Sequence, residues 1–316
     1  MKNGDRREME RRVRERFPRA QAIEQIRGEA SLRRFFRLTF RRGSRVAMVY
    51  PSGSQGEVER VLHMSALYAR RGLPVPRVVE AGQGIILLED LGDLSLQRLF
   101  RRGCEADRKK ALPQIVRLLG TLSEIPVNET AAILDKGRLD SEMAFFLDHF
   151  LRRHPPVAVA IAELRSALGA LTAAIDPPAV FAHRDFHSRN MLWCNGRLYL
   201  VDFQDSLVAP RFYDLVSFAY DSYLELGPRR QELFCRLAES GWVITGDQVR
   251  LTALQRNIKA LGTFAFQIHE RGRGSYARYI PRTVSHIMGH LRELRRAEFD
   301  ALRLYFRNCV IFPRCP

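Results

Sequence analysis

Lysine is almost missing from the first third of this chain. No lysine occurs between Asn3 and Arg108, and 46 of the 51 basic residues among the 316 are arginine. A phosphate group bound by this part of the protein would therefore need arginine, whose planar guanidinium can hold phosphate through two parallel hydrogen bonds.

Long apolar runs and paired cysteines are missing as well. No stretch approaches the ~20 consecutive apolar residues that span a bilayer, and residues 1–17 are charged without the apolar segment of a signal peptide. We therefore expect a cytoplasmic protein that does not enter a membrane. The five cysteines are scattered, with no C-x-x-C pair and no zinc-finger spacing, which favours reduced thiols with structural roles.

Positive charge is abundant, with a formal net charge of +16. Such a balance admits nucleic acid, anionic membranes or phosphorylated ligands as partners. The arginines are spread over the whole chain, however, and no basic stripe interleaved with aromatic residues is present. We therefore expect no nucleic-acid partner and interpret most of the charge as a solvated surface.

The first part of the chain has the pattern of a small α+β domain. An amphipathic helix is expected over residues 6–17. Strands are expected over residues 20–26, 34–40, 45–51, 75–82 and 84–93, with one helix over residues 57–71 inserted after the third strand. These elements predict a five-stranded antiparallel domain over residues 1–93.

From residue 94 to 316 the pattern is mostly helical. Helices are expected over residues 107–124, 140–153, 159–174, 211–226, 228–239 and 247–269. The exception is residues 179–205, where MLWC and LYLVDF flank a Cys-Asn-Gly turn and predict a short β-hairpin. The chain is thus expected to be a two-domain α+β protein, with a small N-terminal domain and a larger helical one.

The strongest chemical signal is a polar cluster in this exception. Residues 182–190 read AHRDFHSRN, and Asp202 follows Asn190 after twelve residues, at the end of an apolar strand. The spacing from His183 through Asp185 to Asn190 matches H-x-D-x-x-x-x-N. In that pattern the Asp accepts a hydroxyl proton and the Asn carbonyl oxygen binds Mg²⁺. Asp202 would add a carboxylate oxygen, and such oxygen ligands suit Mg²⁺ beside nucleotide phosphates. The alternative is a polar loop without function, in which Asp202 is a turn residue.

The same segments resemble the aminoglycoside phosphotransferase-like kinases, which have a two-lobed, protein-kinase-like fold. The chain is more similar still to the anomeric N-acetylmuramate and N-acetylglucosamine kinases of cell-wall recycling. The residues that carry the resemblance are RGEASLRRFFRL (27–38), IILLEDLGD (85–93), HRDFHSRN (183–190), VDFQDSLVAPRFYDLVS (201–217) and LQRNIKALGTFA (254–265). They occur in the same order and span most of the chain.

The resemblance implies roles for individual residues, with ATP and Mg²⁺ as cofactors. Asp185 would be the catalytic base, and Asn190 and Asp202 would bind the metal ion. His183 would support the loop, while His187 would either contact the transferred phosphoryl group or bond to the backbone. The nucleotide would lie against a set drawn from residues 28–34 and 89–91, namely Gly28, Ser31, Arg33, Arg34, Glu89 and Leu91.

One position departs from the kinase pattern. The third strand reads RVAMVYP, so Met48 stands where kinases place the lysine that pairs with the nucleotide phosphates. The amino-sugar kinases also often lack this lysine, which fits the narrower resemblance. Arg33, Arg34 or Arg45 would then supply the positive charge.

The resemblance further implies an amino-sugar acceptor, attacked at its anomeric hydroxyl. Candidate acceptor residues are Asp205, Arg256 and Lys259, although the two basic side chains are also compatible with a solvated helix face. An aminoglycoside, choline or homoserine acceptor is an alternative, and a non-catalytic pseudokinase is another. The basic candidates Arg256 and Lys259 argue against a cationic acceptor, because like charges repel. The presence of Asp185, Asn190 and Asp202 argues against a pseudokinase, because a binding protein needs none of them.

Overall fold

The computed structural model describes residues 3–26 and 33–308. The chain divides into two compact units, Met1–Leu96 with Asn190–Gln204, and Gln97–Arg189 with Asp205–Pro316. Residues 190–204, which the sequence analysis assigned to the C-terminal domain, thus belong to the first unit. Backbone hydrogen bonds explain this assignment, because Trp193 N–H donates to the Leu94 carbonyl at 2.7 Å and Leu200 N–H to the Pro74 carbonyl at 2.8 Å.

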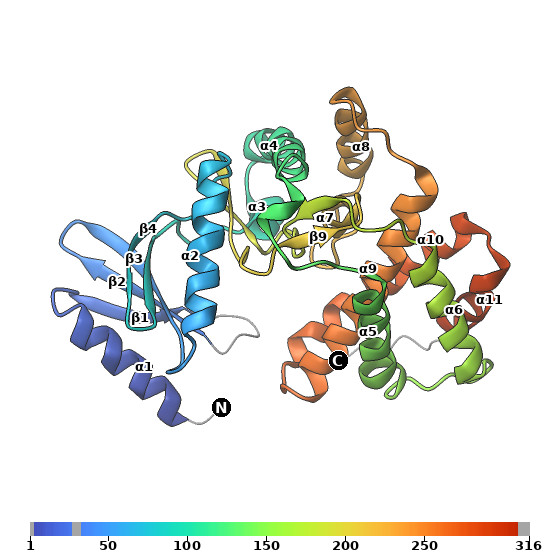
Figure 1. Ribbon diagram of the computed structural model, residues 1–316, viewed down its shortest axis with the longest axis horizontal. Coiled ribbons are helices and arrows are strands. Elements are labelled where there is room, and N and C mark those ends of the chain that lie inside the picture. Colours follow the sequence, from blue (N-terminus) through green and yellow to red (C-terminus); the bar gives the residue numbers. More distant parts are fainter. Residues whose placement is uncertain (1–2, 27–32, 309–316) are drawn as a thin grey trace. The chain divides into compact units, whose positions relative to one another are not determined.

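The first unit is built on a five-stranded antiparallel sheet with the order β1-β2-β3-β5-β4 (Figure 1). This confirms the expected sheet. Its strands are β1 (Ala22–Ile26), β2 (Arg34–Phe40), β3 (Gly43–Val49), β4 (Val78–Gly82) and β5 (Ile85–Glu89). The unit also contains helices α1 (Asn3–Arg16) and α2 (Gln55–Arg70) and the hairpin strands β7 (Met191–Cys194) and β8 (Arg197–Leu200).

The two helices of this unit cover opposite faces of the sheet. Alternation along the strands sends every second side chain to the same face. Phe36, Ala47 and Leu87 therefore pack with Met9 and Val13 of α1. Their neighbours in sequence face the other way, where Met48, Ile86 and Leu88 pack with Val58 and Val61 of α2. Burial of both faces explains why β5 reads as a continuous apolar run.

The second unit is mostly helical, as expected. Its helices are α3 (Leu96–Arg102), α4 (Glu105–Ser123), η1 (Val127–Glu129), α5 (Lys136–Phe146), η2 (Leu147–Leu151), α6 (Ile161–Ala174), α7 (Tyr213–Ala219), α8 (Arg229–Glu239), α9 (Gly246–His269), η3 (Gly274–Tyr279), α10 (Ile280–Leu294), η4 (Ala297–Phe299) and α11 (Asp300–Asn308). Strands β6 (Val180–Ala182) and β9 (Leu207–Ala209) form a short antiparallel pair.

Helix α9 is the centre of the second unit and packs against α5, α7 and α10. Its apolar positions face the largest core of the described residues. At Gly262 the backbones of α9 and α5 come close together, since a Cβ atom added there would lie 2.8 Å from Phe146 Cα. Only a glycine permits this approach, and it fixes which residues of the two helices face each other.

Some helices differ from the sequence expectation. Helices α3, α10 and α11 were not expected, although Ile280, Val284, Ile287 and Leu291 of α10 show helical spacing and are buried. Helix α7 ends at Ala219 instead of Leu226, because the chain then turns and the Asp221 carboxylate accepts backbone N–H groups. Within residues 3–26 and 33–308, no helix is long and apolar enough to cross a membrane.

Candidate active site

The segment His183–Arg189 is anchored to the second unit by two carboxylates. Asp214 of α7 accepts the backbone N–H of His183 at 2.6 Å and that of Arg184 at 3.0 Å. At the other end, Asp221 accepts the N–H of Ser188 at 2.9 Å. Arg184 has a φ of 74°, a left-handed conformation that is uncommon for residues other than glycine. The paired bonds to Asp214 hold this turn.

Burial of the neighbouring side chains completes the anchor. Phe186 is inaccessible to solvent and packs edge-on against Phe218, and His183 is also fully buried. Burial raises the pKa of Asp214 to about 7, although the N–H groups of His183 and Arg184 act against this shift. The two donors therefore stabilise a carboxylate in surroundings that otherwise disfavour charge.

This anchoring leaves the Asp185 side chain about one-third exposed, at 35%. Its Oδ1 atom lies 3.4 Å from Nη2 of Arg256 on α9. Burial acts to raise the pKa of Asp185, but the positive charges of Lys259 and Arg256 more than offset it and hold the pKa well below its usual range. Asp185 is therefore ionised at neutral pH and accepts hydrogen bonds.

Further charged groups surround Asp185. Glu142 of α5 lies 3.2 Å from Nζ of Lys259 and 3.7 Å from Nη2 of Arg184. Arg256 donates through Nε to Ser217 Oγ at 3.1 Å. The cluster of Glu142, Arg184, Asp185, Arg256 and Lys259, which we call the Asp185 cluster, thus contains three cations and two carboxylates. The side chains of Arg256 and Lys259 are largely shielded from solvent and paired with carboxylates, so they do not form a solvated helix face.

Aromatic side chains border the other end of the segment. The guanidinium of Arg189 lies 4.6 Å from the ring centre of Tyr223, with the rings of Tyr276 and Tyr279 within 5.9 Å. The His187 ring packs edge-on against Tyr223 at 5.0 Å. These contacts orient the side chains on either side of Ser188. Asp205, a further residue expected near the acceptor, belongs to the second unit and is exposed.

The two expected metal ligands belong to the first unit and are brought together by the β7–β8 hairpin. Its turn is Asn195-Gly196, with both φ values positive, as in the tight turns that match the twist of a hairpin. Pairing of Met191 with Leu200 continues in the hydrogen bond from Val201 N–H to the Asn190 carbonyl at 3.0 Å. Asn190 and Asp202 therefore lie at the open end of the hairpin, on its two chains.

Asp202 has close polar partners in the same unit. Gln204 donates to its Oδ1 atom at 3.0 Å, and the buried guanidinium of Arg33 donates to the same oxygen. Burial acts to lower the pKa of Arg33, but the negative charge of Asp202 and the Tyr50 hydroxyl together outweigh this and raise it. Among the three arginines expected to replace the missing lysine, Arg33 is thus the one paired with Asp202. The Arg45 guanidinium instead donates to the adjacent Ser44 carbonyl at 2.6 Å.

The ligand types at this position fit a hard divalent cation. Asn190 offers an amide oxygen and Asp202 a carboxylate, and Mg²⁺ takes such ligands together with phosphate oxygens and water. No group of three or more His, Cys, Asp or Glu side chains that could hold a metal ion occurs in residues 3–26 and 33–308. Two protein ligands of these types suit Mg²⁺ that is also bound by nucleotide phosphates.

Two further residues that were expected to bind the nucleotide, Glu89 and Leu91, lie at the end of β5. The Glu89 N–H donates to the Arg77 carbonyl at 2.9 Å, and Leu91 is buried. Asp90, which lies between them, accepts two hydrogen bonds from Arg37 at 2.7 and 3.0 Å and thereby ties this segment to β2. Arg34 lies at the start of β2, whereas Gly28 and Ser31 lie outside the described residues.

Some residues of the site could not be found from the sequence. Glu142 is a single acid on a helix with many charges, and nothing in its spacing links it to Lys259. Asp221 has a weak signal, since an Asp after an amphipathic helix often accepts backbone N–H groups. Gly262 lies inside a helical pattern, where a glycine commonly marks a close contact.

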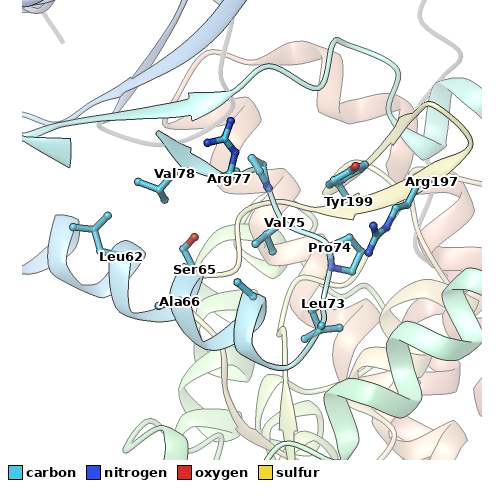
Figure 2. Close-up of a pocket in the computed structure, with 13 residues that line it drawn as sticks. Leu62, Ser65, Ala66, Leu73, Pro74, Val75, Arg77, Val78, Arg197 and Tyr199 are labelled. Atoms are coloured by element: carbon cyan, nitrogen blue, oxygen red, sulfur yellow. The ribbon is translucent and has the colours of Figure 1, made fainter. Parts of the chain in front are cut away.

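The first unit also has a hollow of about 530 Å³ (Figure 2). It is lined by the second half of α2, residues 72–78, Arg197 and Tyr199. Leu62, Ala66 and Val75 give it an apolar wall. Among the described residues, none of those expected to bind nucleotide or metal lines it.

The fold and the polar residues define a phosphotransferase of the protein-kinase-like class. The first unit has a five-stranded sheet and places Arg33 beside Asp202 at the end of the hairpin. The helical second unit contains the segment His183–Arg189, which Asp214 and Asp221 anchor. The chain belongs to the phosphotransferase enzyme family, whose model matches residues 22–249.

Relatives of known name support this assignment. An N-acetylmuramate/N-acetylglucosamine kinase of Neisseria meningitidis is 25% identical over 88% of this chain and 86% of its own length. A kinase of the same name from Pseudomonas aeruginosa is 28% identical over 80% of this chain and 79% of its own length.

Solved structures with the same fold are more distant in sequence. Choline kinase LicA from Streptococcus pneumoniae has a TM-score of 0.65 at 15% identity, with 89% of this chain and 99% of that chain covered. A thermostable mutant of aminoglycoside phosphotransferase APH(4)-Ia, in a ternary complex with ADP and hygromycin B, has a TM-score of 0.61 at 17% identity and covers 88% and 97%. The expected protein-kinase-like fold is confirmed.

Proposed function

We propose that this protein transfers the γ-phosphoryl group of ATP to the anomeric hydroxyl of N-acetylmuramate or N-acetylglucosamine, giving the sugar 1-phosphate. The single observation that carries the proposal is the Asp185 cluster, in which an ionised carboxylate lies among three buried or half-buried cations. The names of the relatives from Neisseria meningitidis and Pseudomonas aeruginosa support the choice of sugar.

The charge of the cluster favours an acceptor with one acidic group. Three cations face two carboxylates, so one positive charge remains for a ligand. N-acetylmuramate carries a lactyl carboxylate that would supply the opposite charge. Arg256 is the better partner for it, because a guanidinium has several donor nitrogens, of which Nη2 faces Asp185 at 3.4 Å, whereas the single nitrogen of Lys259 is paired with Glu142 at 3.2 Å. A cationic acceptor such as an aminoglycoside or choline would instead add to the surplus.

Asp185 is proposed to orient the acceptor hydroxyl and to take its proton. The acceptor oxygen forms a bond to the γ-phosphorus while the bond from that phosphorus to the β–γ bridging oxygen breaks, and the hydroxyl proton passes to Asp185. The lowered pKa makes Asp185 a weak base, which suits a late proton transfer. An anomeric hydroxyl reduces the difference in acidity between the acceptor hydroxyl and Asp185. The ring oxygen withdraws electron density and makes this hydroxyl more acidic than other sugar hydroxyls.

The first unit is proposed to hold the nucleotide. Asn190 and Asp202 would bind Mg²⁺, which when present neutralises phosphate charge and orients the γ-phosphoryl group. Arg33 would reach the nucleotide phosphates from its position beside Asp202 and so replace the lysine that Met48 displaces. Glu89 and Leu91 would line the adenine, with Asp90 holding their segment in place.

An assay of ATP consumption over a panel of sugars tests this proposal. We expect turnover with N-acetylmuramate and N-acetylglucosamine, dependence on Mg²⁺, and none with choline or an aminoglycoside. Arg256→Ala is expected to raise KM for N-acetylmuramate more than for N-acetylglucosamine, because only the former has the carboxylate. Equal losses on both sugars would remove the carboxylate contact, and activity only on cationic acceptors would contradict the proposed substrate class.

A further inference from the structure

Tyr50 follows strand β3 and lies beside Arg33 in the first unit, and no sequence pattern assigns it a function. Strands β2 and β3 pair with Arg34 opposite Val49, so the same register, extended by one residue, places Arg33 opposite Tyr50. Residues directly opposite each other in an antiparallel pair send their side chains to the same face of the sheet. For this pair it is the face that α2 covers, because the Tyr50 side chain is part of the core between the sheet and α2.

The position of Tyr50 is fixed on both sides of the residue. Its N–H donates to the Gly84 carbonyl at 2.9 Å, and its carbonyl accepts a hydrogen bond from Nη1 of Arg12, on α1, at 2.8 Å. Pro51 follows, and a proline favours an extended backbone in the residue before it. Tyr50 is also buried, with 5% of its surface exposed. Its hydroxyl is therefore a hydrogen-bonding group with a fixed place in the sheet.

The guanidinium of Arg33 is enclosed by three groups of the same unit. Nη2 donates to the Asp202 carboxylate, and the Phe35 ring centre lies 5.6 Å from the guanidinium carbon. The third group is the Tyr50 hydroxyl, which accepts a hydrogen bond from Arg33 and, together with Asp202, raises the pKa of Arg33 against the opposite effect of burial. The Arg33 side chain is 10% exposed, so these contacts decide the direction in which its guanidinium points.

Helix α2 does not contribute to this enclosure. Protein kinases hold the lysine of the third strand through an ion pair with a glutamate of the following helix. Here Met48 takes the place of that lysine and packs against Val58 of α2. Helix α2 is described over its whole length, and its two acids, Glu57 and Glu59, are exposed to solvent. A cation on this face of the sheet therefore has to be held by groups outside α2, and for Arg33 these are the groups named above.

We infer that Tyr50 is a positioning residue whose hydroxyl holds the Arg33 guanidinium in place for the nucleotide phosphates, as the helix glutamate holds the lysine in protein kinases. This inference rests on the proposed function, in which Asp202 binds Mg²⁺ and Arg33 binds phosphate. In that state Arg33 and the metal ion share one carboxylate, and the two cations repel each other. The neutral Tyr50 hydroxyl is not shared with the metal ion, so it keeps Arg33 in place when the charge of Asp202 is divided.

A comparison in two backgrounds tests the inference, with the Kd of Mg·ATP measured by calorimetry in the absence of sugar. Tyr50→Phe removes only the hydroxyl and keeps the buried ring, and we expect it to raise this Kd about 5- to 20-fold. In a protein that already carries Arg33→Met, the same change should alter Kd less than about 2-fold, because the hydroxyl then has no guanidinium to hold. Tyr199→Phe, at a half-buried tyrosine of β8 in the same unit, is the control and should leave Kd within about 2-fold of the wild type.

The two backgrounds separate positioning from a structural role. An equal loss of affinity with and without Arg33, or no loss in the wild-type background, would overturn the inference, because Tyr50 would then act independently of Arg33. If the double variant does not fold, the kinetic constants of Tyr50→Phe decide. Positioning of Arg33 raises KM for ATP and leaves KM for the sugar unchanged, whereas a parallel change in both would overturn the inference.

Failure of the proposed function would give a different result. A wild type that binds Mg·ATP but phosphorylates neither sugar contradicts the proposed acceptor, and the Kd values in the two backgrounds still test the role of Tyr50. A wild type that phosphorylates the sugar while Tyr50→Phe binds Mg·ATP as well as the wild type overturns the inference alone. A wild type that binds no Mg·ATP would overturn both.

Discussion

Arg256 Nη2 lies 3.4 Å from Asp185 Oδ1, and this pair joins the central helix of the second unit to the H-x-D segment. The Arg256 side chain is 12% exposed, so the pair is largely shielded from water on the arginine side. Such a cation keeps Asp185 ionised and fixes one of its oxygens. The proposed acceptor site therefore combines two regions 71 residues apart in sequence.

Replacement of Asp185 by Asn tests its role in the transfer. The variant retains the shape of the side chain and loses the ability to take a proton. We expect turnover to fall about 10²- to 10⁴-fold, the usual range for loss of a general base. Binding of ATP, measured by calorimetry, should be unchanged, and Asp176→Asn on the surface of the same unit should behave as wild type. Near wild-type turnover in Asp185→Asn would show that the assignment is wrong.

The two proposed metal ligands should differ in importance. Asp202→Ala removes a carboxylate and is expected to abolish turnover and weaken the binding of Mg·ATP. Asn190→Ala removes only a neutral carbonyl oxygen and should have the milder effect. Titration with Mg²⁺ at fixed ATP measures both, and negligible effects in both variants would mean that other groups hold the metal ion.

Arg33 and Arg45 are two candidates for the positive charge that the missing lysine would supply, and the same substitution in each compares them. Arg33→Met removes the guanidinium beside Asp202 and is expected to raise KM for ATP about 10-fold or more, since a hydrogen bond to a charged group contributes ~1.5–3 kcal/mol. Arg45→Met should leave KM for ATP within about 3-fold of the wild type, because its guanidinium bonds to the adjacent backbone. The opposite order would assign the phosphate contact to Arg45.

Gly262→Ala tests the close approach of α5 and α9. The added Cβ would lie 2.8 Å from Phe146 Cα, a backbone atom that cannot move aside alone. We expect a loss of about 1–3 kcal/mol in the free energy of unfolding, as for other overpacked cores. Gly169→Ala in α6 is the control, because nothing lies within 4 Å of the added Cβ, and it should be neutral or stabilising. Urea denaturation of both variants measures the difference, and an equally stable Gly262→Ala would contradict the tight packing.

Much of this architecture could be predicted from the sequence because it depends on residues that are close together in the chain. The apolar alternation of β2, β3 and β5 and the Asn195-Gly196 turn are properties of neighbouring residues, and they predicted the sheet and the hairpin. The spacing of His183, Asp185 and Asn190 predicted a polar loop before the hairpin in the same way, and the catalytic role of these residues stays a prediction. The sequence predicted that helix α7 would extend to residue 226, but it ends at Ala219. The chain turns there because the Asp221 carboxylate accepts the N–H of Ser188, in a loop that is distant in sequence.

The pairings of the charged residues could not be predicted, because they depend on tertiary packing. Arg256 and Lys259 were named as acceptor residues, but their neighbours Asp185 and Glu142 become visible only once α9 is placed against α5 and the H-x-D segment. The choice of Arg33 over Arg45 likewise required the fold to bring Asp202 to it. A sequence lists the charges, and the packing of helices and strands decides which of them meet.

Identification of the product by phosphorus NMR tests the central claim most directly. The protein is incubated with ATP, Mg²⁺ and N-acetylglucosamine or N-acetylmuramate, and the new phosphate ester is identified by the coupling of its phosphorus to a sugar proton. The proposed function predicts coupling to the anomeric proton, which marks a sugar 1-phosphate. A 6-phosphate, or no ester from either sugar while a different alcohol is phosphorylated, would contradict it.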